Sequence, residues 1–214
     1  MGAPDPDRGR RLLRAAGRSR RFRRGDVLMM AGAPSTGVLL VESGLVKVVL
    51  PGHDGDDPVA GLFSAGELLG EIGVLSGRPR SAHVIALTTG RVVEVAGAAF
   101  PSGDRDVHEL LLRSWIKRQN HADERQRMQH REVPTRVALS LQRWAREFGV
   151  PTERGVEVRG LSQQDIAQAV AASAKSVEAV LHELREGGLL HTGRLRYALP
   201  DPDALDEVIS RAAW

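Results

Sequence analysis

Short apolar segments, separated by glycine, proline and polar residues, make up the chain from Phe22 to Phe100. Many short strands close together are typical of a small all-β sandwich or barrel. The run from Pro51 to Asp57 supplies glycine and aspartate at turn positions, so we expect a hairpin with a polar tip there. The expected strands are Val27 to Met30, Gly37 to Val41, Leu45 to Leu50, Val59 to Phe63, His83 to Leu87 and Arg91 to Val95.

No glycine or proline interrupts the chain between Gly103 and Pro134, which predicts one long helix. From Val107 to Ile116 its apolar residues recur at a spacing of three or four, so this half offers an apolar seam. The second half, from 117 to 131, contains only two apolar residues. A helix that is polar all round bridges solvent or packs against a polar partner or ligand.

The C-terminal part alternates short helices and strands. Pro134 opens a helix over 135–148, a short strand follows near 156–158, and a two-stranded wing over 189–199 is expected to turn at Thr192-Gly193. Between them, helices over 163–170 and 174–186 are joined by three residues, which is the spacing of a helix-turn-helix. Ser162, with Asp165 three residues on, and Ser173 are the expected N-caps.

The outer face of the second of these helices has the geometry that enters a DNA major groove. Residues 161–196 hold four basic and four acidic side chains, so one copy of this module should bind DNA weakly and act as a pair. Five arginines are expected to contact phosphates: Arg194 and Arg196 on the wing, and Arg136, Arg143 and Arg146 nearby. The other candidate DNA contacts are Ser162, Gln163, Ser173, Ala174, Lys175, Ser176, Glu178 and Ala179.

Composition and charge narrow the function classes. The 214 residues include no cysteine, which excludes thiolate catalysis, Cys-ligated zinc, iron–sulfur clusters and disulfides. No apolar run is long enough for a membrane span or a signal peptide, so we expect a cytoplasmic protein with no membrane partner. The net charge is +3, yet residues 1–24 alone carry +7. We interpret residues 1–20 as a flexible basic leader, with a functional basic arm as the alternative.

The most specific stretch for chemistry runs from Gly66 to Ala82. Its glycines allow a short helical turn whose backbone amides approach an anion, and Arg80 supplies a bidentate fork for that anion. Ser81 adds a hydroxyl group, and the carboxylate of Glu71 can accept a hydrogen bond from a ribose hydroxyl. A β-barrel that holds such a loop is a pocket for a small nucleotide.

These features together resemble the cAMP receptor protein/FNR (CRP/FNR) family of bacterial transcription regulators, from Phe22 to Leu205. The shared motifs are the turn glycines Gly25, Gly32 and Gly44, the loop from Gly70 to Ala82, and the winged helix over 161–199. The resemblance implies an α+β fold with a jelly-roll-like cyclic-nucleotide-binding β-roll over 21–102, a dimerisation helix over 103–133 and a winged helix-turn-helix over 134–214.

The resemblance further implies a homodimer that binds palindromic double-stranded DNA, with RNA polymerase as a further partner and cAMP or cGMP as effector rather than a cofactor. By carry-over, Arg80 and Ser81 hold the cyclic phosphate and Glu71 holds the ribose 2′-hydroxyl. Backbone groups of Gly70, Ile72 and Ala82 complete this ligand site.

The chain departs from the family pattern at three places. His121 and Ala122 stand where many members have a Thr-Ser pair, which leaves Asn120, His121 and Glu124 as candidate contacts to the purine. Ala171 stands where the helix-turn-helix carries glycine, and Ala174, Lys175 and Ala179 replace the residues that read guanine in many relatives.

Two other readings remain open. The winged helix could serve protein interaction instead of DNA, or the protein could sense another effector, such as haem held by His53, His83 or His108. No pair of histidines has the spacing of a metal site, so no metal ligand is predicted. No nucleophile and base are paired in the sequence, so we expect no catalytic residues and no enzyme activity.

Overall fold

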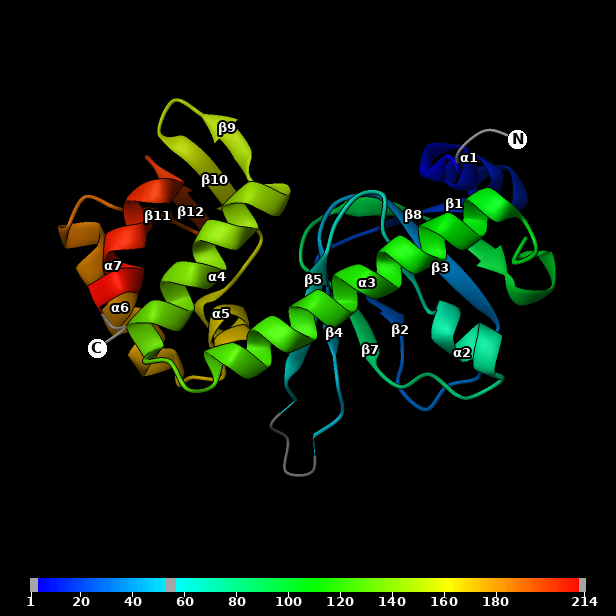
Figure 1. Ribbon diagram of the computed structural model, residues 1–214, viewed down its shortest axis with the longest axis horizontal. Helices are drawn as coiled ribbons and strands as arrows, with labels where there is room; N and C mark the ends of the chain where they lie inside the picture. Colours follow the sequence, from blue (N-terminus) through cyan, green and yellow to red (C-terminus); the bar gives the residue numbers. More distant parts are fainter. Residues whose placement is uncertain (1–3, 53–56, 212–214) are drawn as a thin grey trace. The chain divides into compact units, whose positions relative to one another are not determined.

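The computed structural model describes residues 4–52 and 57–211, which divide into two compact units, residues 1–122 and 123–214. The N-terminal unit holds two four-stranded antiparallel sheets, ordered β1-β8-β3-β6 and β2-β7-β4-β5 (Figure 1). Its strands are β1 Arg18–Phe22, β2 Val27–Met29, β3 Gly37–Ser43, β4 Val46–Val49, β5 Val59–Phe63, β6 Leu68–Leu69, β7 His83–Ala86 and β8 Gly90–Ala96.

Alternation along the strands divides the apolar residues between two cores, because successive side chains of a strand point to opposite faces. Leu39 and Val41 of β3 face the core between the two sheets. Val38 and Leu40 of the same strand face a second core, against α1 (Pro6–Ala16) and α3 (Arg105–Met128). The second core keeps α3 on the outer face of the first sheet.

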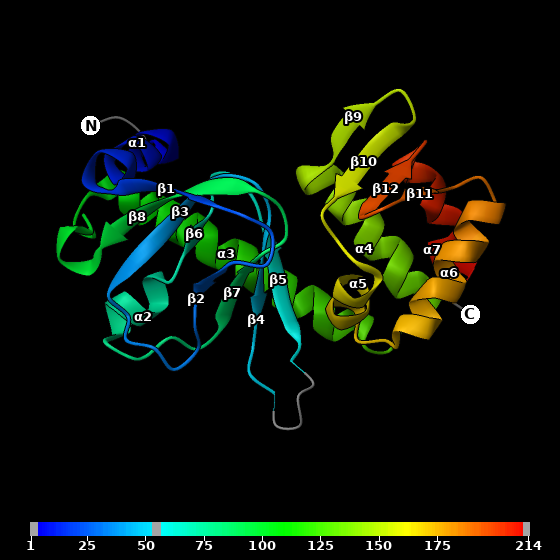
Figure 2. The same cartoon turned by 180° about the vertical axis from the view of Figure 1, so that it is seen from behind.

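Strands β4 and β5 pair as the expected hairpin, in the sheet seen from behind in Figure 2. The tip of this hairpin includes residues 53–56, which lie outside the described residues.

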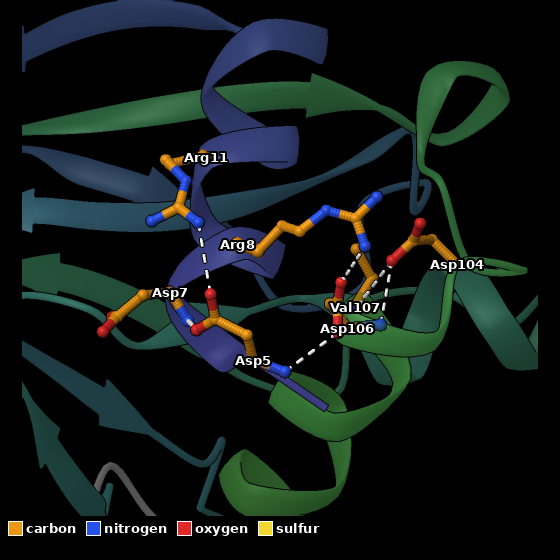
Figure 3. A network of polar contacts seen from close by, with 7 residues as sticks. All are labelled: Asp5, Asp7, Arg8, Arg11, Asp104, Asp106 and Val107. Atoms are coloured by element: carbon orange, nitrogen blue, oxygen red, sulfur yellow. Dashed lines mark hydrogen bonds and ion pairs between the residues drawn. The ribbon is translucent and has the colours of Figure 1, made fainter. Parts of the chain in front are cut away.

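Residues 6–22 form helix α1 and strand β1, so the expectation of a flexible leader is wrong for this segment. Asp5 caps α1, and Leu13 is fully buried in the core against α3. The buried carboxylate of Asp106 accepts a 2.9 Å hydrogen bond from the backbone N–H of Asp5 and pairs with Arg8 (Figure 3). The basic charge of this segment is therefore carried on an ordered helix and strand.

The long helix is shorter than expected, because α3 ends at Met128 and α4 (Val133–Phe148) begins after a short turn. The C-terminal unit contains a four-stranded sheet ordered β11-β12-β10-β9. Its remaining elements are β9 Val150–Thr152, β10 Gly155–Arg159, α5 Gln163–Val170, α6 Ala174–Glu186, β11 His191–Gly193, β12 Arg196–Leu199 and α7 Asp206–Arg211. Short 3₁₀ turns cover Gly97–Ala99 and Pro202–Leu205.

Candidate functional site

The loop from Gly66 to Ala82 folds around a short helix, α2 (Glu71–Ser76). Gly70 precedes this helix with a φ of 83°, a left-handed conformation that favours glycine. A β-carbon at Gly70 would lie 2.5 Å from Nη1 of Arg80 and 2.4 Å from Cε of Met29. The glycine is therefore required both for the turn and for the close approach of the arginine.

The Arg80 guanidinium is held by two backbone carbonyls. Nη1 donates to the Gly70 oxygen at 2.7 Å, and Nη2 donates to the Gly37 oxygen. Burial lowers the pKa of Arg80, and the negative charge of Glu71 opposes that shift. A guanidinium has five N–H donors, so about three stay available for an anion after these two bonds.

Glu71 is buried beside Arg80, with 4% of its surface exposed. Its Oε1 lies 2.6 Å from Nη1 of Arg118 on α3. Its Oε2 is buried and has no hydrogen-bond partner among the described residues. A buried carboxylate oxygen without a donor is costly, and a ligand hydroxyl would supply that donor.

Arg118 is a residue of this candidate site that the sequence did not reveal. Besides pairing with Glu71, it donates to the Leu68 carbonyl at 2.6 Å and lies over the Phe63 ring at 5.6 Å. In the sequence, Arg118 stands out only because it follows the spacing of three or four residues of the apolar seam on the long helix. Its role depends on α3 lying against the first sheet, which no local pattern reveals.

The other predicted ligand contacts are more dispersed. Ile72 and Ser81 are exposed and Ala82 is half-buried. On α3, Asn120 is exposed and His121 is half-buried near Gly61 of β5. Glu124 belongs to the C-terminal unit, where its Oε2 pairs with Nη1 of Arg143 at 2.5 Å, so the structure engages it elsewhere than at a purine.

Helices α5 and α6 have the bounds expected from the sequence. Ser162 and Asp165 form a reciprocal capping box on α5, and Ser173 caps α6 through the backbone N–H of Ser176. The inner face of α6 is buried through Val177, Val180, Leu181 and Leu184. The exposed candidates for DNA contact are Gln163, Ser173, Ala174, Lys175, Glu178 and Ala179, with Ser162 and Ser176 half-buried.

Three arginines of α4 that were expected to contact phosphates are engaged inside the unit. Arg136 donates to the carbonyls of Val170 and Ala171 at 2.6 and 2.9 Å, where α5 ends. Arg143 pairs with Glu124, and Arg146 pairs with Asp203 at 2.7 Å. Arg136 therefore holds the end of α5, while the exposed pair of Arg146 leaves that side chain in contact with water.

The wing turns at Arg194-Leu195, two residues later than predicted, because Gly193 pairs with Arg196. Leu195 takes a left-handed φ of 58° at this turn. The sequence instead leads us to expect a glycine, Gly193, at the turn. Arg194 and Arg196 are exposed, as a phosphate contact requires. Arg159 of β10 lies opposite Arg196 in the sheet, and both reach the Glu157 carboxylate, a cluster that the sequence alone did not reveal.

The positions of the histidines and carboxylates bear on metal binding, and the length and hydropathy of the helices bear on a membrane span. Within residues 4–52 and 57–211, no three His, Asp or Glu side chains gather so as to hold a metal ion. His108 is exposed, Nδ1 of His83 accepts from the Ala31 backbone at 3.3 Å, and His53 lies outside the described residues. None of the helices in these ranges is long and apolar enough to cross a membrane.

Comparisons with known proteins agree with this two-part architecture. The cyclic nucleotide-binding domain matches residues 19–102, and the Crp-like helix-turn-helix domain matches residues 135–208. A CRP-like cAMP-activated global transcriptional regulator of Mycobacterium tuberculosis is 28% identical over 86% of this chain and 84% of its own length. The global nitrogen regulator of Synechococcus elongatus is 26% identical, over 88% of each chain.

A solved structure of a CRP-family transcriptional regulator from Thermus thermophilus superimposes with a TM-score of 0.78. It is 26% identical, and the alignment covers 91% of this chain and 98% of the other.

Proposed function

Because the chain belongs to the CRP/FNR family of transcription regulators, we propose that a cyclic purine nucleotide bound in its β-roll controls its binding to DNA. The observation that carries this proposal is the buried Glu71 carboxylate beside Arg80, with one oxygen lacking a donor among the described residues. A cyclic nucleotide offers a ribose hydroxyl for that oxygen and an anionic phosphate for the guanidinium. The cAMP-activated relatives support cAMP as the effector.

In this proposal each residue has a defined task. Arg80 and the Ser81 hydroxyl hold the phosphate, while the ion pair with Arg118 orients the Glu71 carboxylate toward the ribose. His121 is the side chain of α3 best placed to meet the base, since it lies near β5 and is half-buried.

The exposed face of α6 reads DNA in the major groove, with Lys175 at the base edges and the wing residues Arg194 and Arg196 on phosphates. Lys175→Ala should change the preference among DNA sequences. Arg194→Ala should weaken binding to all of them and reduce the salt slope by about 0.9. We place the protein in the cytoplasm, where DNA and RNA polymerase are its partners.

We further propose a homodimer paired along α3, on a narrower seam than the sequence predicted. Val107 and Leu110 are buried in the protein's own core. Leu112, Trp115 and Ile116 remain 56%, 64% and 53% exposed at a spacing of three and four. A symmetric pair of DNA-binding modules requires a partner for this face.

Calorimetric titration of the full chain with cAMP and cGMP tests the nucleotide proposal. Arg80→Ala should weaken binding about 10 to 150-fold through the loss of a charge-assisted phosphate contact. Arg78→Ala, at an exposed position two residues earlier, is the matched control and should bind as the parent does. Equal affinity of the parent and Arg80→Ala would show that the nucleotide does not bind at this loop.

A further inference from the structure

A pocket of about 560 Å³ in the N-terminal unit is lined by residues of β1, β2, β3 and β8 together with Arg80. Its size is within the range of small-molecule sites, about 300–1,000 Å³. Residues on its wall include Arg18, Met29, Gly37, Leu39, Arg80 and Glu94. Of the residues assigned to the nucleotide, only Arg80 lines it.

Three residues that lie side by side in a row on neighbouring strands of the first sheet include two charged ones. They stand on the face of the sheet that elsewhere carries residues of the apolar core. Arg18 lies opposite Glu94, and Glu94 lies opposite Leu39. Glu94 shares a face with Val92, two residues earlier, and both Val92 and Leu39 belong to the core between the sheets. The charged side chains of this row stay in contact with water, because Arg18 is exposed and 46% of the Glu94 side chain is exposed.

The charges that line the pocket do not cancel. Glu94 pairs with Arg20 at 2.6 Å, which satisfies the one carboxylate in the row. Arg18 makes no ion pair with any described residue. Arg18 and Arg80 therefore give the pocket an excess of positive charge.

Arg80 is oriented toward this pocket by the fold itself. Its Nη2 donates to the carbonyl of Gly37, which forms part of the pocket wall. This contact holds the guanidinium at the wall without a ligand, so an anion would meet a preformed donor. Met29 and Leu39 supply an apolar surface beside it.

We propose that this pocket binds a compact organic dianion, a dicarboxylate or a phosphate monoester, between the guanidinium groups of Arg18 and Arg80. The carbon skeleton of the ligand packs against Met29 and Leu39. The inference goes beyond the nucleotide proposal and shares only Arg80 with it. Since both ligands use Arg80, each lowers the affinity of the other by the same factor.

Calorimetry of the full chain with succinate, with glycerol phosphate and with neutral succinamide tests the site. We expect one of the two dianions to bind with a dissociation constant on the order of 1 mM or tighter, and succinamide not to bind. Whichever of the two dianions binds shows whether the pocket takes a dicarboxylate or a phosphate monoester. Arg18→Ala should weaken that binding about 10-fold or more, because it removes a charge-assisted hydrogen bond.

Two control variants separate this site from the nucleotide site. Arg21→Ala removes the same charge from an exposed position of the same strand and should leave dianion binding unchanged. Ser81→Ala should weaken cAMP binding and spare the dianion. Arg18 carries the test because its side chain is exposed, whereas Arg80 joins two backbone carbonyls that the fold uses.

The proposal is overturned if neither dianion binds saturably, if succinamide binds equally well, or if Arg18→Ala binds as the parent does. Dianion binding that depends on Arg18 in a protein that binds no cyclic nucleotide would support the site and remove only the nucleotide proposal.

Discussion

At the scale of single residues, the only tyrosine of the chain reports on the packing of the winged helix. Tyr197 of β12 is 4% exposed, and burial, assisted by the charge of Asp165, raises its pKa to about 12. In the unfolded chain the phenol titrates near 10. The unfolded state therefore loses its proton first, and the stability of this unit falls as the pH rises from about 10 to 12.

Absorbance at 295 nm follows this group without interference from another tyrosine. We expect a midpoint near pH 12 in the folded protein and near pH 10 in guanidinium chloride. Tryptophan fluorescence recorded in parallel shows whether the protein stays folded. A native midpoint near 10 would mean that Tyr197 is accessible to water and that the packing of β12 is looser than described.

At the scale of the element, the turn between α5 and α6 is strained at one residue. Ala171 adopts φ 50° and ψ 54°, a left-handed conformation in which a β-carbon is unfavourable. Its side chain is exposed, so the substitution Ala171→Gly loses no packing. We expect this variant to stabilise the C-terminal unit by about 1 kcal/mol.

The same substitution two residues earlier is the control, because Ala169 lies inside α5. Ala169→Gly should destabilise the unit by about 1 kcal/mol, which gives the two variants opposite signs in urea denaturation. Two variants that shift the midpoint in the same direction would contradict the left-handed assignment of Ala171.

Helix α1 depends on one buried carboxylate at the start of α3. The Asp5 backbone N–H and then Arg8 hold the pKa of Asp106 below its usual value. A lowered pKa contributes stability above about pH 4 that is lost as the pH falls through the folded value. Asp106→Asn should therefore loosen the contact of α1 with the start of α3 at neutral pH. The stability of this variant should also decrease less than that of the parent as the pH falls.

Trypsin cleavage at the arginines of α1 measures this release. Cleavage should be faster in Asp106→Asn than in the parent, and Asp7→Asn should match the parent because its ion pair with Arg10 is exposed and weak. Equal cleavage of Asp106→Asn and the parent would show that the other contacts of α1, such as those of Leu13 and Arg10, hold the helix without Asp106.

These elements also show what the sequence could predict. Helices α5 and α6 were predicted to the residue because Ser162 and Ser173 cap them locally. The end of α3 at Met128 was missed, since no glycine or proline marks it. The wing turn was misplaced because Leu195 takes a conformation that its side chain disfavours, which the sheet register imposes.

The candidate site divides in the same way. The loop with Glu71 and Arg80 was recognisable from residue types and spacing. Arg118 was not, because its role comes from a contact with a distant segment. Arg159 was not, because only the pairing of β10 with β12 places it opposite Arg196.

At the scale of the whole molecule, the proposed dimer seam can be broken by charge. Leu112→Glu combined with Ile116→Glu places two carboxylates on the exposed apolar face and should yield a monomer by light scattering. Leu75→Glu is the control, because Leu75 is 55% exposed on another helix and should leave the oligomeric state unchanged. A specific dimer should form at a concentration of roughly tens of micromolar. A parent protein that is monomeric at that concentration would contradict the proposed dimer.

The regulatory proposal requires that nucleotide and DNA affinities be coupled equally in both directions. Glu71 contacts Arg118 on α3, so a ligand at this carboxylate acts directly on the helix proposed to join two copies of the chain.

If cAMP tightens DNA binding by a given factor in fluorescence anisotropy, DNA must tighten cAMP binding by the same factor in calorimetry, because the two measurements close one thermodynamic cycle. We expect a factor of about 5 to 150. Arg118→Ala should reduce this factor more than it reduces nucleotide affinity, whereas Arg78→Ala, at an exposed position away from α3, should preserve both. Nucleotide binding that leaves DNA affinity unchanged in either direction would refute the switch and favour a winged helix that serves protein interaction.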